Sequence, residues 1–326
     1  MKENNNTNKK AFSEIIKSNS IAFFAICIAT VSLVIGIFSL VLIGVDSHNV
    51  LRFYPDGNGN YIVAVGDAKH LSEIVIPKRY KFGKVVGIDN EGFANCDKLT
   101  KIVIPDSVTE IGDNAFEYCI SLEDVILGDG LKIIGPSAFY NCTSLKTITI
   151  PDGVTDIGEH AFTRCESLEI ISIPESVSYI GALAFSENES IEFTEYEGAC
   201  YLGNKENPYH TLVMVKNNGA SSYSIHPSTK VIYSKAFAYC TSLTFIDIPD
   251  SVTCIGTEAF YESTSLCSIV IPKSLELISD RAFYGCDSLE EIYYTGKEES
   301  AYKIQVGSSN EAFSNAVVYC EYTRTN

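Results

Sequence analysis

Eleven cysteines are the residues of this chain with the widest chemical potential, because thiols form disulfides, bind metals and act as nucleophiles. Six of them hold one position of a regular pattern: Cys96, Cys119, Cys142, Cys165, Cys240 and Cys286. Asn188 and Ser263 hold that position elsewhere, which indicates a site for a small, weakly polar side chain. Stacked coils would bring neighbouring cysteines within disulfide range, so the sequence leaves both buried free thiols, which we favour, and disulfides open.

Metal and catalytic chemistry find little support in the residue pattern. There is no C-x-x-C pair and the five histidines are scattered, so a zinc site is not expected. Asp56, Asn58 and Asn60 alternate as in a calcium loop, but no bidentate glutamate follows, and a plain turn is the favoured interpretation. The chain also lacks G-x-S-x-G, H-E-x-x-H and P-loop motifs. We therefore predict no metal, no cofactor and no enzymatic activity.

The regular cysteines belong to a sequence repeat of 23 residues, and the fold of that repeat must position them. Phenylalanine recurs at this spacing in two series, Phe93, Phe116, Phe139, Phe162 and Phe185, then Phe237, Phe260 and Phe283. A strict period of this length is typical of a solenoid, in which each repeat packs only on its neighbours. The copies follow the pattern LxxIxIPxxVxxIGxxAFxxC, of which Leu145–Cys165 is a clean example.

Each part of the pattern predicts a local structure. Ile148 and Ile150 alternate with polar residues, as in a strand, and Pro151 ends that strand because proline cannot donate to the ladder. A second short extended stretch ends at Ile157, and Gly158 then suggests a turn with positive φ. The AFxxC segment predicts a short helical turn. Stacking would give a repeat solenoid with a parallel sheet on one face.

Two rows of side chains should point outward from these strands, and they vary from coil to coil. Variable side chains on a fixed lattice are typical of recognition, so we expect a binding surface on the concave face; the alternative is that the apolar members simply favour a sheet. The first row is Lys101, Asp124, Thr147, Ile170, Phe245, Ser268 and Glu291, and the second is Val103, Ile126, Thr149, Ser172, Asp247, Val270 and Tyr293. The expected anchors for a partner are Ile126, Ile170, Phe245 and Tyr293.

The period breaks between Phe185 and Phe237, where residues of about 186–222 form an irregular island. We expect the island to project from the array. Its candidate contact residues are Tyr196, Tyr201, Tyr209 and His210, since exposed tyrosines among polar groups are typical of contact surfaces. The favoured alternative is a self-packed hairpin that joins the two halves of the array.

The ends of the chain differ from the repeats. Residues 46–70 predict a capping hairpin, 71–294 the repeats, and 295–326 a C-terminal cap. Ile21–Val45 carries no charge and is long enough to cross a membrane as a helix. The lysines of residues 1–20 then place that tail in the cytoplasm and the repeats outside the plasma membrane. The alternative is a cleaved signal peptide and a secreted protein.

The motif LxxIxIPxxVxxIGxxAFxxCxSL, over about Leu71 to Tyr294, resembles the BspA-like, or treponemal, class of leucine-rich repeats. The resemblance implies a surface-anchored, non-enzymatic protein that binds an extracellular protein or glycan in adhesion. The formal net charge of −17 argues against nucleic acid as a partner. A second hypothesis is a structural cell-surface protein acting through self-association. A hydrolase is disfavoured because the catalytic motifs are missing, and a sensor because twenty residues before the apolar segment are too few for a signalling domain.

Overall fold

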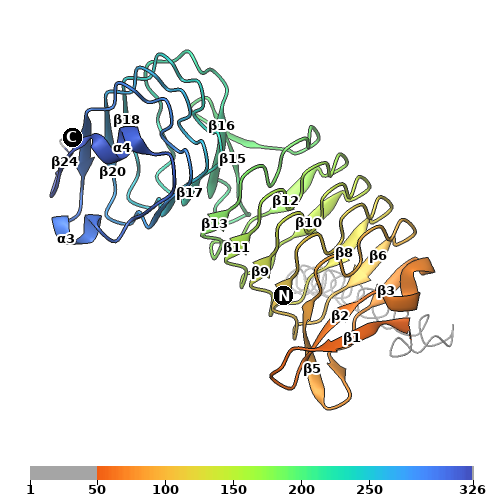
Figure 1. Cartoon of the computed structure of the whole chain (residues 1–326). Coiled ribbons are helices and arrows are strands. Elements are labelled where there is room, and N and C mark those ends of the chain that lie inside the picture. Colours follow the sequence, from red (N-terminus) through yellow and green to blue (C-terminus); the bar gives the residue numbers. More distant parts are fainter. Residues whose placement is uncertain (1–49, 325–326) are drawn as a thin grey trace, which may run out of the picture. The chain divides into compact units, whose positions relative to one another are not determined.

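The computed structural model describes residues 50–324, which fold as coils that follow one another in sequence order (Figure 1). Leu51–Asn326 is one compact unit. The predicted span Ile21–Val45 lies outside the described residues. Within residues 50–324, no helix has the length and apolar character needed to span a membrane.

The alternating segment of each coil forms a strand, and these strands make up what we call face A. Ile148 is buried while Thr147 and Thr149 are exposed, so the predicted alternation is confirmed. The strands pair in parallel with a shift of one coil, in the groups β3-β6-β8, β10-β12 and β18-β20-β22-β24. Face A consists of β3 (Glu73–Val75), β6 (Lys101–Val103), β8 (Asp124–Ile126), β10 (Thr147–Thr149), β12 (Ile170–Ser172), β18 (Phe245–Asp247), β20 (Ser268–Ile271), β22 (Glu291–Tyr294) and β24 (Val317–Tyr319).

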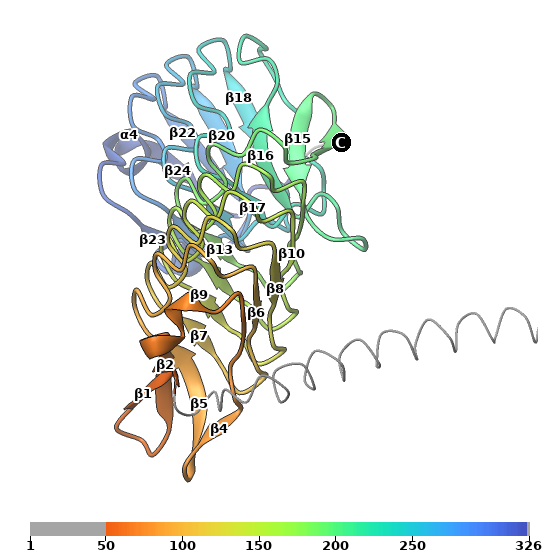
Figure 2. The same cartoon turned by 90° about the vertical axis from the view of Figure 1, so that its right-hand side faces the viewer.

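The second extended stretch of each coil also forms a parallel sheet, face B, which adds a second sheet to the one that the sequence predicted. Figure 2 shows β6, β8 and β10 along one side of the coils, and β7, β9 and β13 along the other. The repeat strands of face B are β5 (Gly83–Ile88), β7 (Glu110–Ile111), β9 (Ile133–Ile134), β11 (Asp156–Ile157), β13 (Tyr179–Ile180), β17 (Val231–Ile232), β19 (Cys254–Ile255), β21 (Leu277–Ile278) and β23 (Gln305–Val306). A coil therefore presents two hydrogen-bonded edges to its neighbour.

Irregular elements stand at both ends of the array. At the start, β1 (Arg52–Pro55) and β2 (Tyr61–Ala64) form an antiparallel hairpin, followed by the 3-10 helix η1 (Gly66–His70) and by β4 (Arg79–Tyr80), which pairs with β5. Asp56 accepts hydrogen bonds from the backbone N–H groups of Asn58 at 2.8 Å and Asn60 at 2.9 Å, as in a turn. At the far end lie α3 (Glu298–Ala301) and α4 (Glu311–Asn315), and Phe313 of α4 stacks on Phe283 with ring centroids 5.0 Å apart.

The island does not project from the array; it extends face B. Its strands are β14 (Thr194–Tyr196), β15 (Ala199–Leu202) and β16 (Thr211–Val215), joined as an antiparallel meander. β16 then pairs in parallel with β17, so the meander starts the second block of face B, while β13 ends the first. An extra hairpin thus covers what would be an open sheet edge.

The AFxxC segment is not the predicted helical turn. Asn114 and Tyr118 have left-handed backbone conformations, with φ of 54° and 58°. Every second N–H group of this segment points along the stack: Phe116 donates to the Ala138 carbonyl at 2.7 Å, and Tyr118 to the Tyr140 carbonyl at 2.8 Å. The N–H groups between them, such as that of Glu117, bond within the coil to the carbonyl three residues earlier. The alternate groups that are satisfied by the next coil form a third ladder.

The repeated glycine has a different cause from the one the sequence suggested. Gly158 lies outside the left-handed region, so the expectation of positive φ is wrong. A Cβ at Gly158 would lie 2.4 Å from the backbone nitrogen of Pro136, in the preceding coil. At Gly181 it would lie 2.4 Å from the nitrogen of Glu159. Glycine is therefore needed because consecutive backbones approach too closely for any side chain.

The centre of the array is a column of phenylalanines. Phe139 is fully buried, and its ring lies 5.1 Å from Phe116 and 5.3 Å from Phe162, nearly parallel to both. The second half repeats this stacking from Phe237 to Phe260 at 5.0 Å. Buried aromatic area and ring stacking both favour this arrangement, so the column is the main tertiary contact between coils on that side.

The repeated cysteine position is a hydrogen-bond donor site. The thiol of Cys142 donates to the Phe116 carbonyl at 3.2 Å, and Cys119 and Cys165 make the equivalent contact. Where the residue differs the contact persists: Asn188 donates to Phe162 and Ser263 to Phe237, both at 2.8 Å. The ten cysteines among residues 50–324 are free thiols in this structure. Burial raises the pKa of Cys142 well above its usual range, so this thiol stays protonated.

Candidate functional site

The outward side of face A carries the two predicted rows. Ile126, Ile170 and Phe245 are exposed apolar residues, with 37%, 56% and 43% of their surface accessible. The other exposed members are Asp124, Thr147 and Thr149, and the half-buried members are Lys101, Val103, Ser172, Asp247, Ser268, Glu291 and Tyr293. Strand pairing sets the spacing of both rows, because Thr147 lies opposite Ile170 and Phe245 opposite Ser268.

Val270 is an exception and a wrong prediction, since it is only 1% exposed. In the pairing register it lies between Asp247 and Tyr293. Arg324 bonds to Asp247, and the ring of Tyr322 lies 4.9 Å from that of Tyr293. The chain between these two contacts therefore crosses face A beside Val270, which accounts for its burial. The repeat pattern could not indicate this, because the covering segment lies outside the repeats.

Residues 320–324 form this covering segment. Glu321 and Tyr322 donate backbone hydrogen bonds to the carbonyls of Gly296 at 2.8 Å and Tyr294 at 3.0 Å. Before it, Tyr319 of β24 stacks on Tyr293 at 5.4 Å. The segment thus runs from the last strand of face A back toward β18.

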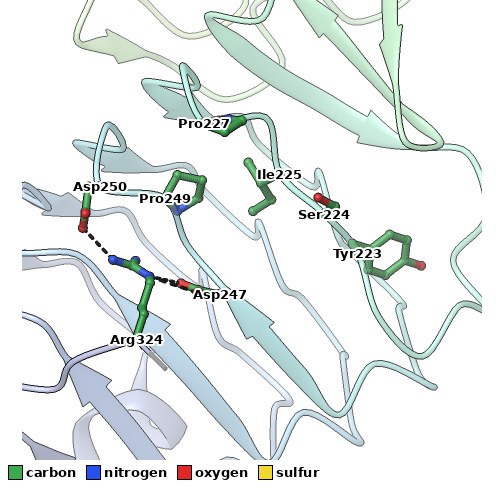
Figure 3. Close-up of a pocket in the computed structure, with 8 residues that line it drawn as sticks. All are labelled: Tyr223, Ser224, Ile225, Pro227, Asp247, Pro249, Asp250 and Arg324. Carbon is green, nitrogen blue, oxygen red and sulfur yellow. Dashed lines mark hydrogen bonds and ion pairs between the residues drawn. The ribbon is translucent and has the colours of Figure 1, made fainter. Parts of the chain in front are cut away.

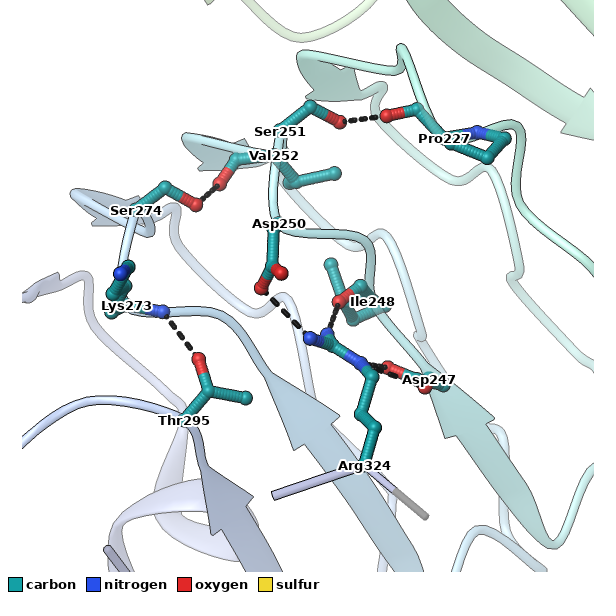
Figure 4. Close-up of polar contacts among 10 residues, drawn as sticks. All are labelled: Pro227, Asp247, Ile248, Asp250, Ser251, Val252, Lys273, Ser274, Thr295 and Arg324. Atoms are coloured by element: carbon teal, nitrogen blue, oxygen red, sulfur yellow. Dashed lines mark hydrogen bonds and ion pairs between the residues drawn. The ribbon is translucent and has the colours of Figure 1, made fainter. Parts of the chain in front are cut away.

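Arg324 ends this path at an acidic site that sequence reasoning missed (Figure 4). Its Nε lies 2.9 Å from both carboxylate oxygens of Asp247, one terminal nitrogen donates to Asp250 at 2.8 Å, and the other donates to the Ile248 carbonyl at 2.6 Å. The side chain of Arg324 is 29% exposed, against 41% for Asp247 and 67% for Asp250. All three nitrogens of the guanidinium therefore have an oxygen partner at hydrogen-bond distance.

A pocket of about 470 Å³ adjoins this ion pair (Figure 3). Its lining residues are Tyr223, Ser224, Ile225, Pro227, Asp247, Pro249, Asp250 and Arg324. Tyr223 is held in place by a hydrogen bond from its hydroxyl to the Asn217 carbonyl and by an edge contact with Phe237, with centroids 5.4 Å apart. The pocket thus combines an apolar wall with two carboxylates and a guanidinium.

Short hydrogen bonds between coils fix the loops around this pocket (Figure 4). The hydroxyl oxygen of Ser251 lies 2.6 Å from both the Pro227 and the Thr229 carbonyl oxygens, which share its one hydrogen. Ser274 makes an equivalent bond to Val252 at 2.8 Å. Asp250 therefore sits on a loop that is tied to the coils on either side.

Two of the four island candidates are wrong as contact residues. Tyr201 and His210 are both fully buried, because the island packs into face B. The hydroxyl of Tyr201 accepts a hydrogen bond from the His226 backbone at 3.2 Å, and burial lowers the pKa of His210 to about 4. Tyr196 and Tyr209 are half-buried, and Tyr209 stacks on the His226 ring at 3.8 Å. The island behaves as the self-packed joint of the favoured alternative.

Sequence reasoning also missed a row of tyrosines on the side of the coils formed by the AFxxC segments, which we call the turn side. Tyr239, Tyr261 and Tyr284 follow one another with ring centroids 5.5 and 5.3 Å apart. The guanidinium of Arg281 lies 5.3 Å from the Tyr261 ring and 5.1 Å from the Tyr284 ring. The available signal was the recurrence of tyrosine one or two residues after the AF pair. No cluster of three possible metal-ligating side chains occurs among residues 50–324.

One family model matches the chain, and it describes a repeat. Residues 86–204 and 216–316, more than half of the chain, match the model of the BspA type leucine rich repeat region in 6 copies. That model describes a repeat region rather than a catalytic domain. No curated protein matches the chain.

Several solved structures are similar to it. A leucine-rich repeat protein of Treponema pallidum is 21% identical, with 74% of this chain and 88% of that chain covered and a TM-score of 0.46. One from Bacteroides ovatus is 28% identical, with 83% and 69% covered and a TM-score of 0.44. The pneumococcal vaccine antigen PcpA is 18% identical, with 84% and 86% covered and a TM-score of 0.37.

Proposed function

The chain belongs to the family of BspA type leucine-rich repeat proteins, and on this premise we propose that it is a non-catalytic binding protein. The partner would be an extracellular protein or a glycan, held on the outward side of face A, in cell-surface adhesion. The observation that carries the proposal is the exposure of Ile126, Ile170 and Phe245 on strands fixed by backbone pairing. Exposed apolar and aromatic side chains on a rigid frame lose little conformational freedom when a partner covers them.

The proposed location is the outer side of the plasma membrane, with Ile21–Val45 as a single-pass anchor and residues 1–20 in the cytoplasm. The length of the uncharged stretch and the lysines before it support this topology. Secretion after signal cleavage is the alternative. Residues 51–326, which form one compact unit, would be the part presented to partners.

Binding can be measured with the purified full chain in detergent on an array of matrix proteins, cell-surface proteins and glycans at physiological salt. We expect a saturable partner whose binding is lost in Ile170→Ala or Phe245→Ala. Phe82→Ala is the matched control, since Phe82 is 95% exposed at the turn between β4 and β5, away from the two rows. All three variants should have the same melting temperature as the wild type. Saturable binding that survives both face A substitutions would overturn the proposed surface.

Self-association is a second candidate, and the last strand of face A favours it. Val317, Val318 and Tyr319 of β24 are 57%, 46% and 46% exposed, and β24 pairs on one side only, with β22. An apolar strand edge of this kind is a template for pairing with another chain. Sedimentation velocity over a range of concentrations would detect dimers, and Val318→Lys should abolish them. A strictly monomeric chain at all concentrations would count against this function.

A further inference from the structure

Arg324 and the face A site that holds it have the chemistry of a ligand and its receptor within one chain. The guanidinium meets the Asp247 carboxylate, the Asp250 carboxylate and the Ile248 carbonyl at 2.6 to 2.9 Å. These three acceptors lie within four residues of β18 and the loop that follows it. The segment that carries Arg324 lies 74 to 77 residues further along the chain.

We propose that Asp247, Asp250 and the Ile248 carbonyl form a recognition site for an arginine side chain in an extended peptide segment, and that residues 320–324 occupy it in this structure. The external ligand is then an exposed, arginine-bearing segment of a partner protein, which competes with the chain's own Arg324. This narrows the proposed function, on which it rests for its biological partner, but a short peptide tests the site without that partner.

The geometry selects arginine over lysine. Three acceptors lie around the guanidinium plane, so each nitrogen finds an oxygen in its own direction. A lysine ammonium is a point charge at the end of a flexible chain and could not reach all three acceptors with fixed geometry. The site is also prearranged, since Ser251 on the same loop is bonded to the preceding coil. Fixed acceptors lower the ordering cost of binding.

The covering segment is held lightly enough to be exchanged. Beyond β24 its backbone donates one hydrogen bond to face A, from Tyr322 to Tyr294 of β22, and one from Glu321 to Gly296 in the loop that follows. The carboxylate of Asp250 stays 67% exposed even with Arg324 in place, so an approaching guanidinium can reach it. The net charge of −17 attracts a basic segment from solution.

The neighbouring pocket offers a partner an apolar surface beside the arginine site. It continues from the ion pair along Tyr223, Ile225 and Pro227, which form an apolar wall (Figure 3). A ligand with an apolar side chain next to its arginine would bury that side chain here, in addition to reproducing the contacts of Arg324. This extra burial is what would let a partner displace an occupant that is already tethered.

The test uses the full chain in detergent and a fluorescent peptide with the sequence of residues 321–325, EYTRT. Arg324→Ala removes the internal occupant, and Arg324→Lys does so while keeping the charge of the segment. Arg164→Ala is the matched control, since Arg164 pairs with the exposed Glu187 on the turn side. A second peptide carries citrulline, which is isosteric with arginine and uncharged. Melting temperatures of all variants are recorded in parallel.

We expect both Arg324 variants to bind the arginine peptide about tenfold more tightly than the wild type. If its own segment occupies the site about nine-tenths of the time, only about a tenth of wild-type molecules can accept the peptide, which raises the apparent Kd about tenfold. Arg164→Ala should match the wild type. Citrulline, or Asp250→Asn added to Arg324→Lys, should weaken binding about tenfold or more. Equal binding by wild type and both Arg324 variants would overturn the proposal, and so would equal binding of the two peptides. These results would leave the array experiment on Ile170 and Phe245 unaffected.

Discussion

Replacing Gly158 with alanine tests why the repeat carries a glycine. The new Cβ would lie 2.4 to 2.8 Å from three backbone atoms of Gly135 and Pro136. Carbon atoms normally keep about 3.5 Å, so the overlap approaches 1 Å. The coils cannot separate freely, since Gly158 donates to the Ile134 carbonyl at 2.8 Å and the stacked phenylalanines hold the other side. Overpacking of this kind destabilises a fold by about 1–3 kcal/mol, and we expect the upper half of that range.

Urea denaturation followed by circular dichroism measures the effect. Gly219→Ala is the control, because a Cβ there meets only the Asn217 side-chain oxygen, at 3.3 Å. We expect that variant to lie within about 0.5 kcal/mol of the wild type, or slightly above it, since alanine restricts the unfolded chain.

The order of alanine and asparagine at position 158 separates the two explanations. Asparagine tolerates the left-handed region better than alanine does, so a requirement for positive φ would make Gly158→Asn the milder change. A requirement for space makes Gly158→Asn at least as harmful, because it is larger. A Gly158→Ala variant as stable as Gly219→Ala, or a milder asparagine, would refute the packing argument.

Three further predictions follow from burial. Phe139→Ala should destabilise the array by about 3–5 kcal/mol in the same denaturation assay, while Phe82→Ala changes it by less than about 0.5 kcal/mol; similar effects would contradict the role of the stacked column. Burial lowers the pKa of His210 from 6.5 to about 4, so the unfolded chain takes up a proton that the folded chain does not, and stability should fall by about 3 kcal/mol between pH 6.5 and pH 4. Comparing melting temperatures of the wild type and His210→Gln across that range isolates this share, and parallel curves would refute it. At pH 8 a thiol reagent should label the exposed Cys267 in the folded chain and reach the buried Cys142 only on unfolding, which mass spectrometry of the peptides resolves; equal labelling of both in the folded chain would contradict the assigned burial.

The repeat could be predicted from the sequence because its signal is redundant. Each coil repeats the same choice of buried side chain, so Phe139 and Ile148 have counterparts 23 residues away that confirm their direction. The inward alternation of face A, the leucine-rich-repeat solenoid and the family were predicted in this way and are confirmed. The predicted outward direction of the two rows is confirmed at positions that no other segment covers, such as Ile170 and Phe245.

Two of the wrong predictions, at Val270 and His210, share one cause, which is contact between segments that the period does not relate. Val270 is buried by the return of residues 320–324, and no spacing within the repeats encodes that path. His210 was predicted to be an exposed contact residue because it lies among polar residues of the island. It is buried because the island strand β16 pairs with β17 at the start of the second block of face B. Gly158 is a different case: its neighbours lie one period earlier, but the repeat pattern does not show how closely the two backbones approach, so the glycine was assigned a backbone conformation instead. The Arg324 site pairs an arginine with carboxylates more than seventy positions away, and the sequence gives no register for such a pair.

Because the same three hydrogen-bonded ladders join each coil to the next, the number of coils can change without changing how neighbouring coils pack. The Phe116, Phe139 and Phe162 rings are spaced alike, and the backbone groups between their coils pair in the same pattern. Removing or duplicating one whole set of 23 residues would rejoin surfaces that already fit each other. A gene of this kind can therefore gain or lose coils by unequal recombination and still encode a closed core. The outward rows change with each such event, so a lineage can alter what the surface offers faster than point substitution alone would allow.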